Sequence, residues 1–270
     1  MHKLISELAR LYLADGQQDT DGQPLTPEVL ARQVAGGPAV TAQLVDAAGQ
    51  LRTLVLEFGG KGGGEKHWSE LCTIANALQH ELDLPAPAVS ISGRSSFYLW
   101  LSVETPVPLA QASQFQQLLR QVFLPASTDI LATAPAALPE SVELPPCLQP
   151  SGKWAAFIHP GMGASFVDEP GLDMPPPLHA QLGFVESLRS MTAAQFARAL
   201  AVLQQHAGVA PLAVAAAPVA ATAAAVKAPL SGNGLLLQDA TLEDIVQWLH
   251  ARNIEPTFRH RLPASSRHDA

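Results

Sequence analysis

The sequence has few charged residues and no excess of basic ones. Charged residues make up 15% of the 270 positions, and the formal net charge at pH 7 is −8. Proteins that hold long stretches of nucleic-acid backbone usually carry a basic patch or stripe. Any contact of this chain with nucleic acid is therefore expected to be local, assisted by a metal ion, or weak.

Cysteine is scarce as well. Cys72 and Cys147 are the two cysteines of the chain; they lie far apart and form no CxxC motif. Cys72 falls in an apolar helical run and is predicted to be a buried thiol. The sequence therefore does not predict a disulfide framework, and it fits a reducing compartment, the cytoplasm.

Long, strongly apolar runs are also missing. No stretch of the roughly 18 apolar residues that a membrane-spanning helix needs is found in the sequence. The first 16 residues have an amphipathic helical pattern rather than that of a signal peptide. Residues 207–226 are mainly alanine with interspersed proline, which favours a linker over a membrane span. We expect no membrane partner.

Local signals predict alternating helices and strands over the first 205 residues. Thr26, with Pro27 behind it, is a typical N-cap for a helix that ends before Gly36. Helices are predicted at 3–14, 27–34, 66–82, 109–123, 178–189 and 192–205. Strands are predicted as hairpins 39–45/52–58 and 87–92/97–103, with further strands at 142–144 and 153–159. This order predicts an α+β fold, a mainly antiparallel sheet covered by helices.

Composition divides the chain into parts. Residues 1–205 are predicted to form the α+β domain, and the Ala/Pro-rich residues 206–230 a flexible linker. Residues 231–262 are predicted to form a small helix–strand module, because the capping box at 241–244 opens an amphipathic helix. The hypothesis for this module is that it recruits a protein partner. Residues 263–270 are predicted to be a disordered tail.

The second hairpin contains the most informative motif. Its turn, Ser92-Gly93-Arg94-Ser95, offers backbone N–H groups and a guanidinium, which together are suited to hold a phosphate group. An ordinary hairpin turn with a surface arginine is the alternative. The Gly-rich run at 59–64 lacks the spacing of a P-loop and is predicted to provide mobility.

The hairpin resembles a motif of the archaeo-eukaryotic primase superfamily, the primase-polymerases of replication and mobile elements. The family motif reads SGR-S-G-x-H-x-W, and it is matched by Ser92, Gly93, Arg94, Ser95 and Trp100. Residues 54–59 lie where the family has a D-x-D pair, and residues 144–146 and 166–168 resemble later elements. The resemblance covers about residues 25–205 and implies an RRM-like palm core.

The resemblance also implies roles for individual residues. Glu57 would bind Mg²⁺ or Mn²⁺, and Asp168 would supply a later catalytic acid. The phosphates of a nucleotide would be contacted by Ser92, Gly93, Arg94, Ser95 and Tyr98.

Four positions depart from the family pattern. Glu57 replaces the first Asp, Gly59 the second, Ser96 a Gly, and Tyr98 the His. Two-metal phosphoryl transfer needs several carboxylates, and a neutral tyrosine cannot replace a cationic histidine. The sequence therefore predicts a primase-like protein that binds single-stranded nucleic acid or nucleotide, in a bacterial replication or mobile-element system, without nucleotidyl transfer.

Two alternatives remain open at this point. One is an active primase or polymerase that uses Glu57 and Asp168 with divalent metal. The other is a non-catalytic protein-interaction scaffold, which the net acidity and the long linker favour.

Overall fold

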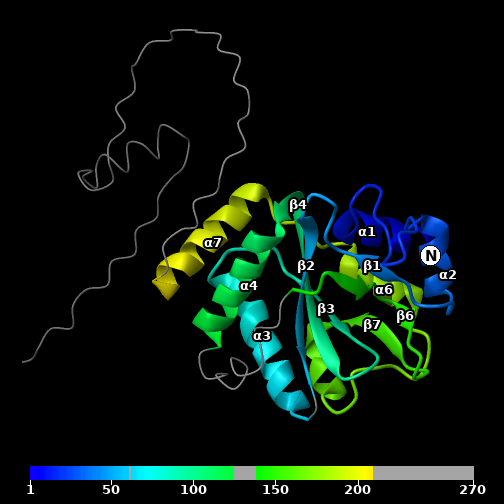
Figure 1. The fold of residues 1–270 in the computed structure, drawn as a ribbon. Coiled ribbons are helices and arrows are strands. Elements are labelled where there is room, and N and C mark those ends of the chain that lie inside the picture. The colour runs from blue at the N-terminus through cyan, green and yellow to red at the C-terminus, as the bar shows by residue number, and fades with distance from the viewer. Residues whose placement is uncertain (61, 125–137, 209–270) are drawn as a thin grey trace, which may run out of the picture. The chain divides into compact units, whose positions relative to one another are not determined.

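The computed structural model describes residues 1–60, 62–124 and 138–208, and its central element is a five-stranded sheet (Figure 1). All neighbouring strands in it are antiparallel. In spatial order the strands are β2 (Gln50–Gly59), β4 (Ser96–Pro108), β3 (Ala88–Ile91), β7 (Trp154–Ile158) and β6 (Cys147–Leu148). The predicted α+β class and the predicted hairpin of β3 and β4 are confirmed.

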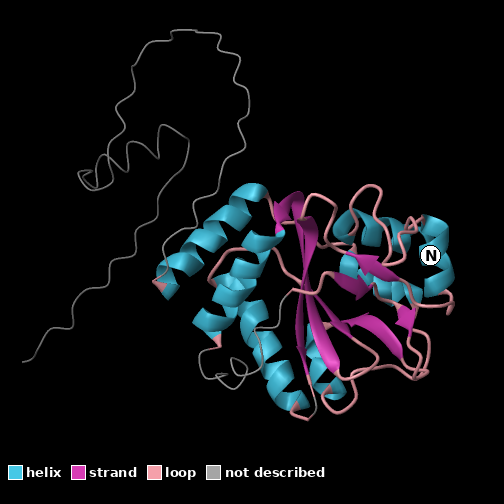
Figure 2. Ribbon diagram, in the orientation of Figure 1, coloured by secondary structure: helices cyan, strands magenta, loops and turns pink. Residues whose placement is uncertain are grey.

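Helices lie on both sides of this sheet (Figure 2). The described residues form α1 (His2–Tyr12), α2 (Pro27–Val34), α3 (Gly64–His80), α4 (Leu109–Phe123), the 3₁₀ helix η1 (Pro160–Phe166), α6 (Leu178–Val185) and α7 (Ala193–Ala207). The Thr26 hydroxyl accepts a hydrogen bond from the backbone N–H of Val29, as predicted for a cap. Thr192 and Gln195 form a capping box at the start of α7.

The two faces of the sheet bury separate apolar clusters, because side chains alternate along each strand. On one face, Leu54, Leu56 and Phe58 of β2 pack in the cluster that includes α3, α4 and α7. On the other face, Val55 of β2 and Trp100 of β4 pack with α1, α2 and α6. The sheet is thus covered on both faces.

The first predicted hairpin is only partly correct. The turn at 46–49 forms, and Val45 bridges to Leu51. Beyond that bridge, β1 (Thr41–Gln43) pairs instead with β5 (Ser141–Glu143) in a separate two-stranded sheet. Pairing between segments about 100 residues apart depends on the tertiary fold, which local composition does not encode.

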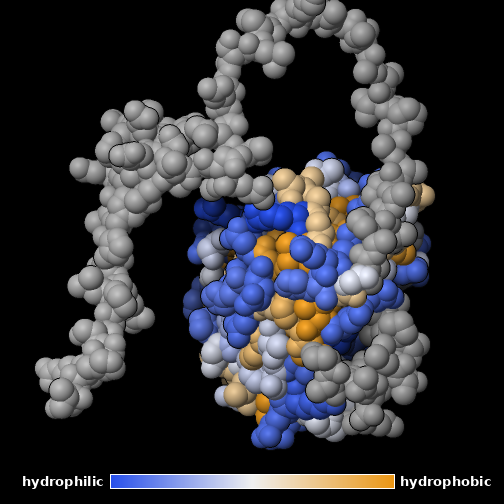
Figure 3. Space-filling model, turned by 90° about the vertical axis from the view of Figure 1, so that its left-hand side faces the viewer, coloured by the Kyte–Doolittle hydropathy of each residue, from blue (hydrophilic) through white to orange (hydrophobic). Residues whose placement is uncertain are grey.

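The side of the molecule that carries α4 and α7 presents apolar side chains framed by hydrophilic ones (Figure 3). Several half-buried residues pack there against the core, among them Val122, Phe123 and Leu200. No helix in the part of the chain that the structure describes is long and apolar enough to span a bilayer.

The predicted linker, module and tail lie outside the described residues, apart from the first three linker positions. There α7 continues to Ala207, and Gly208 caps it with a φ of 65°. The proposed boundaries of these parts, and the partner proposed for the module, stay predictions.

Candidate functional site

The candidate site lies where β2 ends and β4 begins (Figure 1). The register of these strands places Glu57 opposite Tyr98 and Gly59 opposite Ser96. Because side chains alternate along a strand, Glu57 and Tyr98 lie on the same face as Trp100. This is the face covered by α1, α2 and α6.

The side chains that contact the Glu57 carboxylate belong to β4. Its Oε1 accepts a hydrogen bond from Ser96 Oγ at 2.7 Å and lies 3.5 Å from the Tyr98 hydroxyl. Burial, with a smaller contribution from the Glu57 charge, raises the pKa of Tyr98 well above its ordinary value. Tyr98 therefore stays neutral at physiological pH and offers a hydroxyl where the resemblance implies a cationic histidine.

Gly59 has no room for a side chain. A Cβ atom at this position would come within 2.5 Å of Ser96 Cβ and 2.7 Å of Ser96 Cα, and closer still to Ser96 Oγ. In the family pattern, position 59 is an acid and position 96 a glycine. The departures at the two positions are thus coupled: the Ser96 side chain fills the space next to Gly59 and donates its hydroxyl hydrogen to Glu57.

The turn between β3 and β4 directs most of its backbone N–H groups inward. Ser92 Oγ accepts hydrogen bonds from the N–H groups of Arg94 at 3.1 Å and Ser96 at 3.0 Å. The N–H of Gly93 donates to Pro170 O at 2.7 Å, and that of Ser92 to Ser96 O at 2.9 Å. Ser92 is buried and supports the turn, so the exposed side chains available to a ligand are those of Arg94 and Ser95.

The Arg94 side chain extends from this turn toward the two-stranded sheet of β1 and β5. Its Nε donates to Gln149 Oε1 at 2.7 Å, and its Nη2 to the two carboxylate oxygens of Glu143 at 3.1 and 3.3 Å. Gln149 Nε2 in turn donates to Glu143 Oε2 at 2.8 Å. Arg94, Tyr98 and Glu143 line one small open pocket, together with Val142 and Pro145.

Asp168 lies in the loop that follows η1. The carbonyl of the preceding residue, Val167, lies against Gly64 at the start of α3, and the carbonyl of Pro170 accepts a hydrogen bond from the backbone N–H of Gly93 in the turn. This loop therefore reaches the end of the sheet where Glu57 lies. Within the described residues, however, no hydrogen bond or ion pair joins the exposed Asp168 to Glu57.

The site contains three residues that the sequence does not point to. Glu143 and Gln149 contact Arg94 across 49 and 55 positions of sequence, a separation at which no local pattern gives a signal. Arg120 of α4 donates from Nη2 to the backbone carbonyl of Glu57 at 2.6 Å and lies over the Phe58 ring. Arg120 thereby holds the end of β2.

The donor set around Glu57 does not fit the divalent metal that the resemblance implies. Mg²⁺ and Mn²⁺ need several oxygen ligands, commonly from more than one carboxylate. Gly59 supplies no ligand, and one carboxylate oxygen of Glu57 already accepts a hydrogen bond from the Ser96 hydroxyl. No three His, Cys, Asp or Glu side chains are grouped to hold an ion anywhere in residues 1–60, 62–124 and 138–208.

Comparison with known proteins gives one kind of match. No protein-family model matches the chain, and no curated protein does. Among solved structures, the chain is similar to the AEP domain of the primase-polymerase of cyanophage S-2L. The match covers 54% of this chain and 78% of that domain, at 17% sequence identity and a TM-score of 0.33.

Proposed function

We propose that the chain binds a phosphate-bearing ligand, single-stranded nucleic acid or a nucleotide, at the pocket beside Arg94, and does not catalyse nucleotidyl transfer. The observation that carries the proposal is the exposed Arg94 side chain, which lines one open pocket together with Tyr98. An arginine with a planar set of donors is well suited to phosphate oxygens. The resemblance of the hairpin to the primase motif favours the same ligand class and a role in bacterial replication or mobile elements.

The net charge of −8 fits local contact better than a long nucleic-acid track. A single arginine neutralises about one phosphate, so binding would be weak at physiological salt and stronger at low salt. Ser95 and Tyr98 would add hydrogen bonds to the same ligand.

Arg94→Ala is expected to weaken binding of a labelled oligothymidylate or a labelled nucleoside triphosphate about tenfold or more, because charge-assisted hydrogen bonds are worth about 1.5–3 kcal/mol. Fluorescence anisotropy at low salt measures this. Arg198→Ala is the matched control, because Arg198 has a similarly exposed side chain, 55% against 57%, and also pairs with one acid. Equal loss in both variants would mean a general charge effect, and no binding by the intact protein would leave the scaffold alternative.

We expect no primer synthesis or extension by the full chain with Mg²⁺ or Mn²⁺. The reason is that Glu57 is the single carboxylate at the end of β2. It accepts a hydrogen bond from Ser96, and Gly59 has no side chain that could supply a second ligand. The assay is incorporation of labelled nucleotide on a single-stranded template. Product that disappears in Glu57→Ala and in Asp168→Ala would favour the active-primase alternative instead.

A further inference from the structure

We infer that Glu143 is an intramolecular competitor for the ligand of Arg94, and so sets the affinity of the proposed phosphate site. This inference rests on the proposed function. Both oxygens of the Glu143 carboxylate lie within 3.3 Å of Arg94 Nη2. A carboxylate hydrogen-bonded to Arg94 Nη2 in this way occupies a donor that a phosphate oxygen would otherwise use.

Gln149 keeps the two side chains in this arrangement. It accepts from Arg94 Nε at 2.7 Å and donates to Glu143 Oε2 at 2.8 Å, so the three side chains form a closed set of hydrogen bonds. Gln149 is 2% exposed and is therefore fixed in position by its surroundings. The guanidinium is thus oriented in advance, while its charge is matched by Glu143.

The pair joins two different parts of the fold. Arg94 belongs to the turn between β3 and β4, whereas Glu143 ends β5 in the small second sheet. Both side chains line the same pocket. A phosphate that enters the pocket and bonds to Arg94 Nη2 must displace the Glu143 carboxylate or lie against its negative charge.

The ion pair is weak enough for such an exchange. The Arg94 side chain is 57% exposed and that of Glu143 is 27% exposed, and exposed pairs of this kind change an equilibrium by no more than about fivefold. Glu143 would also repel the incoming phosphate, which adds to its effect. We therefore assign to Glu143 a total reduction in affinity of about tenfold.

The test compares Glu143→Gln with the intact full chain in binding a labelled oligothymidylate and a labelled nucleoside triphosphate. Glutamine keeps the shape of the side chain and an acceptor oxygen but removes the charge. We expect binding about ten times tighter, in one arm or both, which also identifies the source of the phosphate. Glu186→Gln is the matched control for net charge, since Glu186 pairs with Lys3 at 2.8 Å, and it is expected to leave binding unchanged.

The double variant R94A/E143Q separates competition from simple charge. E143Q is expected to tighten binding by only about twofold in the R94A background, because only the repulsion of the phosphate by Glu143 remains there once Arg94 is absent. An equal gain from E143Q with and without Arg94 would overturn the inference. So would unchanged affinity of E143Q while R94A is weakened, and in that case the proposed function stands. No binding by any variant would overturn both proposals.

A second variant keeps the test independent of folding. Glu143→Asp retains the charge but withdraws the carboxylate from Arg94, and it is expected to tighten binding less than E143Q does. Thermal unfolding of each variant confirms that the compared proteins are folded. If E143Q is unfolded, an E143D protein that is folded and binds no tighter than the intact chain would overturn the inference.

Discussion

Gly59→Ala is expected to lower the free energy of unfolding by about 3 kcal/mol, the upper part of the range for inserting a methyl group into a filled site. The new Cβ would come within 2.5 Å of Ser96 Cβ and 2.7 Å of Ser96 Cα, so β2 and β4 must separate at the end of the sheet. Gly59→Asp is expected to cost more, because its carboxylate would also lie next to Glu57. Urea denaturation of the full chain measures both.

The cost at Gly59 should depend on Ser96. Ser96→Gly removes the Cβ and Oγ that a side chain at position 59 would meet, although it also removes the hydrogen bond to Glu57. The double variant G59A/S96G is therefore expected to be more stable than the sum of the two single changes predicts, by at least about 1 kcal/mol, as residues in direct contact commonly are coupled. Additive costs would contradict the steric explanation.

Gly183→Ala is the matched control for this experiment. Gly183 lies within α6, and a Cβ there would meet nothing within 4 Å. Alanine is favoured over glycine in a helix by up to about 1 kcal/mol. This variant is expected to be as stable as the intact chain or slightly more stable, which isolates the crowding at Gly59 from the general effect of replacing a glycine.

The contrast between the predicted and observed elements has a physical cause. The helix that follows Thr26 and the helix at 109–123 were predictable almost to the residue, because caps and amphipathic periodicity are local. The partner of β1 was not, since Thr41–Gln43 pairs with a segment about 100 residues away. Short strands carry too little pattern to specify a partner across that distance.

The residues of the candidate site also fall into two groups, those with a local sequence signal and those that only the fold brings together. Glu57, Arg94 and Tyr98 could be named as candidates because each lies in a short segment with its own local pattern, the strand of Glu57 or the β3–β4 hairpin. Glu143 and Gln149 could not, because they reach Arg94 only through the fold. Sequence comparison could identify Gly59 and Ser96 as separate departures from a family pattern, but the coupling between them is visible only in the register of β2 and β4.

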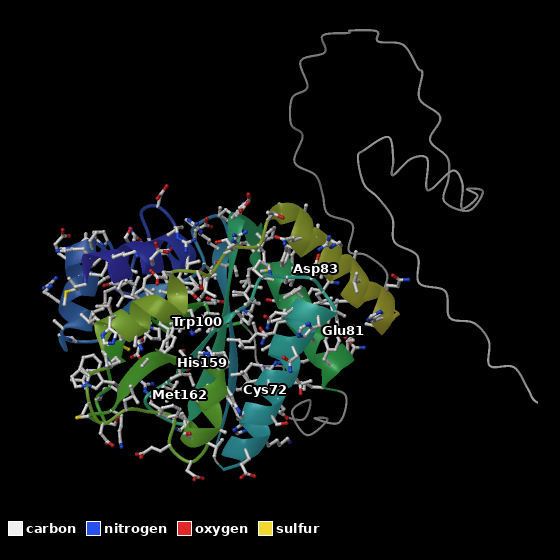
Figure 4. The ribbon with its side chains drawn as sticks, turned by 180° about the vertical axis from the view of Figure 1, so that it is seen from behind. Cys72, Glu81, Asp83, Trp100, His159 and Met162 are labelled. Atoms are coloured by element: carbon white, nitrogen blue, oxygen red, sulfur yellow. The ribbon has the colours of Figure 1, made fainter. Side chains whose placement is uncertain are left out.

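Trp100→Ala is expected to lower the free energy of unfolding by about 3–5 kcal/mol, the usual cost of truncating a fully buried tryptophan. Trp100 matches the last position of the family motif, yet it is 1% exposed and lies in the interior (Figure 4). Its ring is 5.3 Å from Tyr12 and 5.8 Å from Phe157, centroid to centroid. It therefore ties α1, β4 and β7 together beneath the site.

Trp100→Phe tests the polar part of this role. Trp100 Nε1 donates a hydrogen bond to Ser90 Oγ at 2.7 Å, and Ser90 is fully buried. Phenylalanine keeps much of the aromatic packing but leaves the Ser90 hydroxyl without this donor, so we expect a cost of about 1–3 kcal/mol. Adding Ser90→Ala should recover part of that loss, because both partners of the hydrogen bond are then absent.

The same variants separate a role in folding from a role in binding. If Trp100 acts through the core, folded W100F protein should bind the oligothymidylate within about twofold of the intact chain, whereas R94A protein does not. A W100F protein with a native unfolding transition but lost binding would contradict this assignment. The tryptophan of the motif would then act on the ligand through Tyr98, its neighbour on the same face of β4, whose ring centroid lies 6.4 Å away.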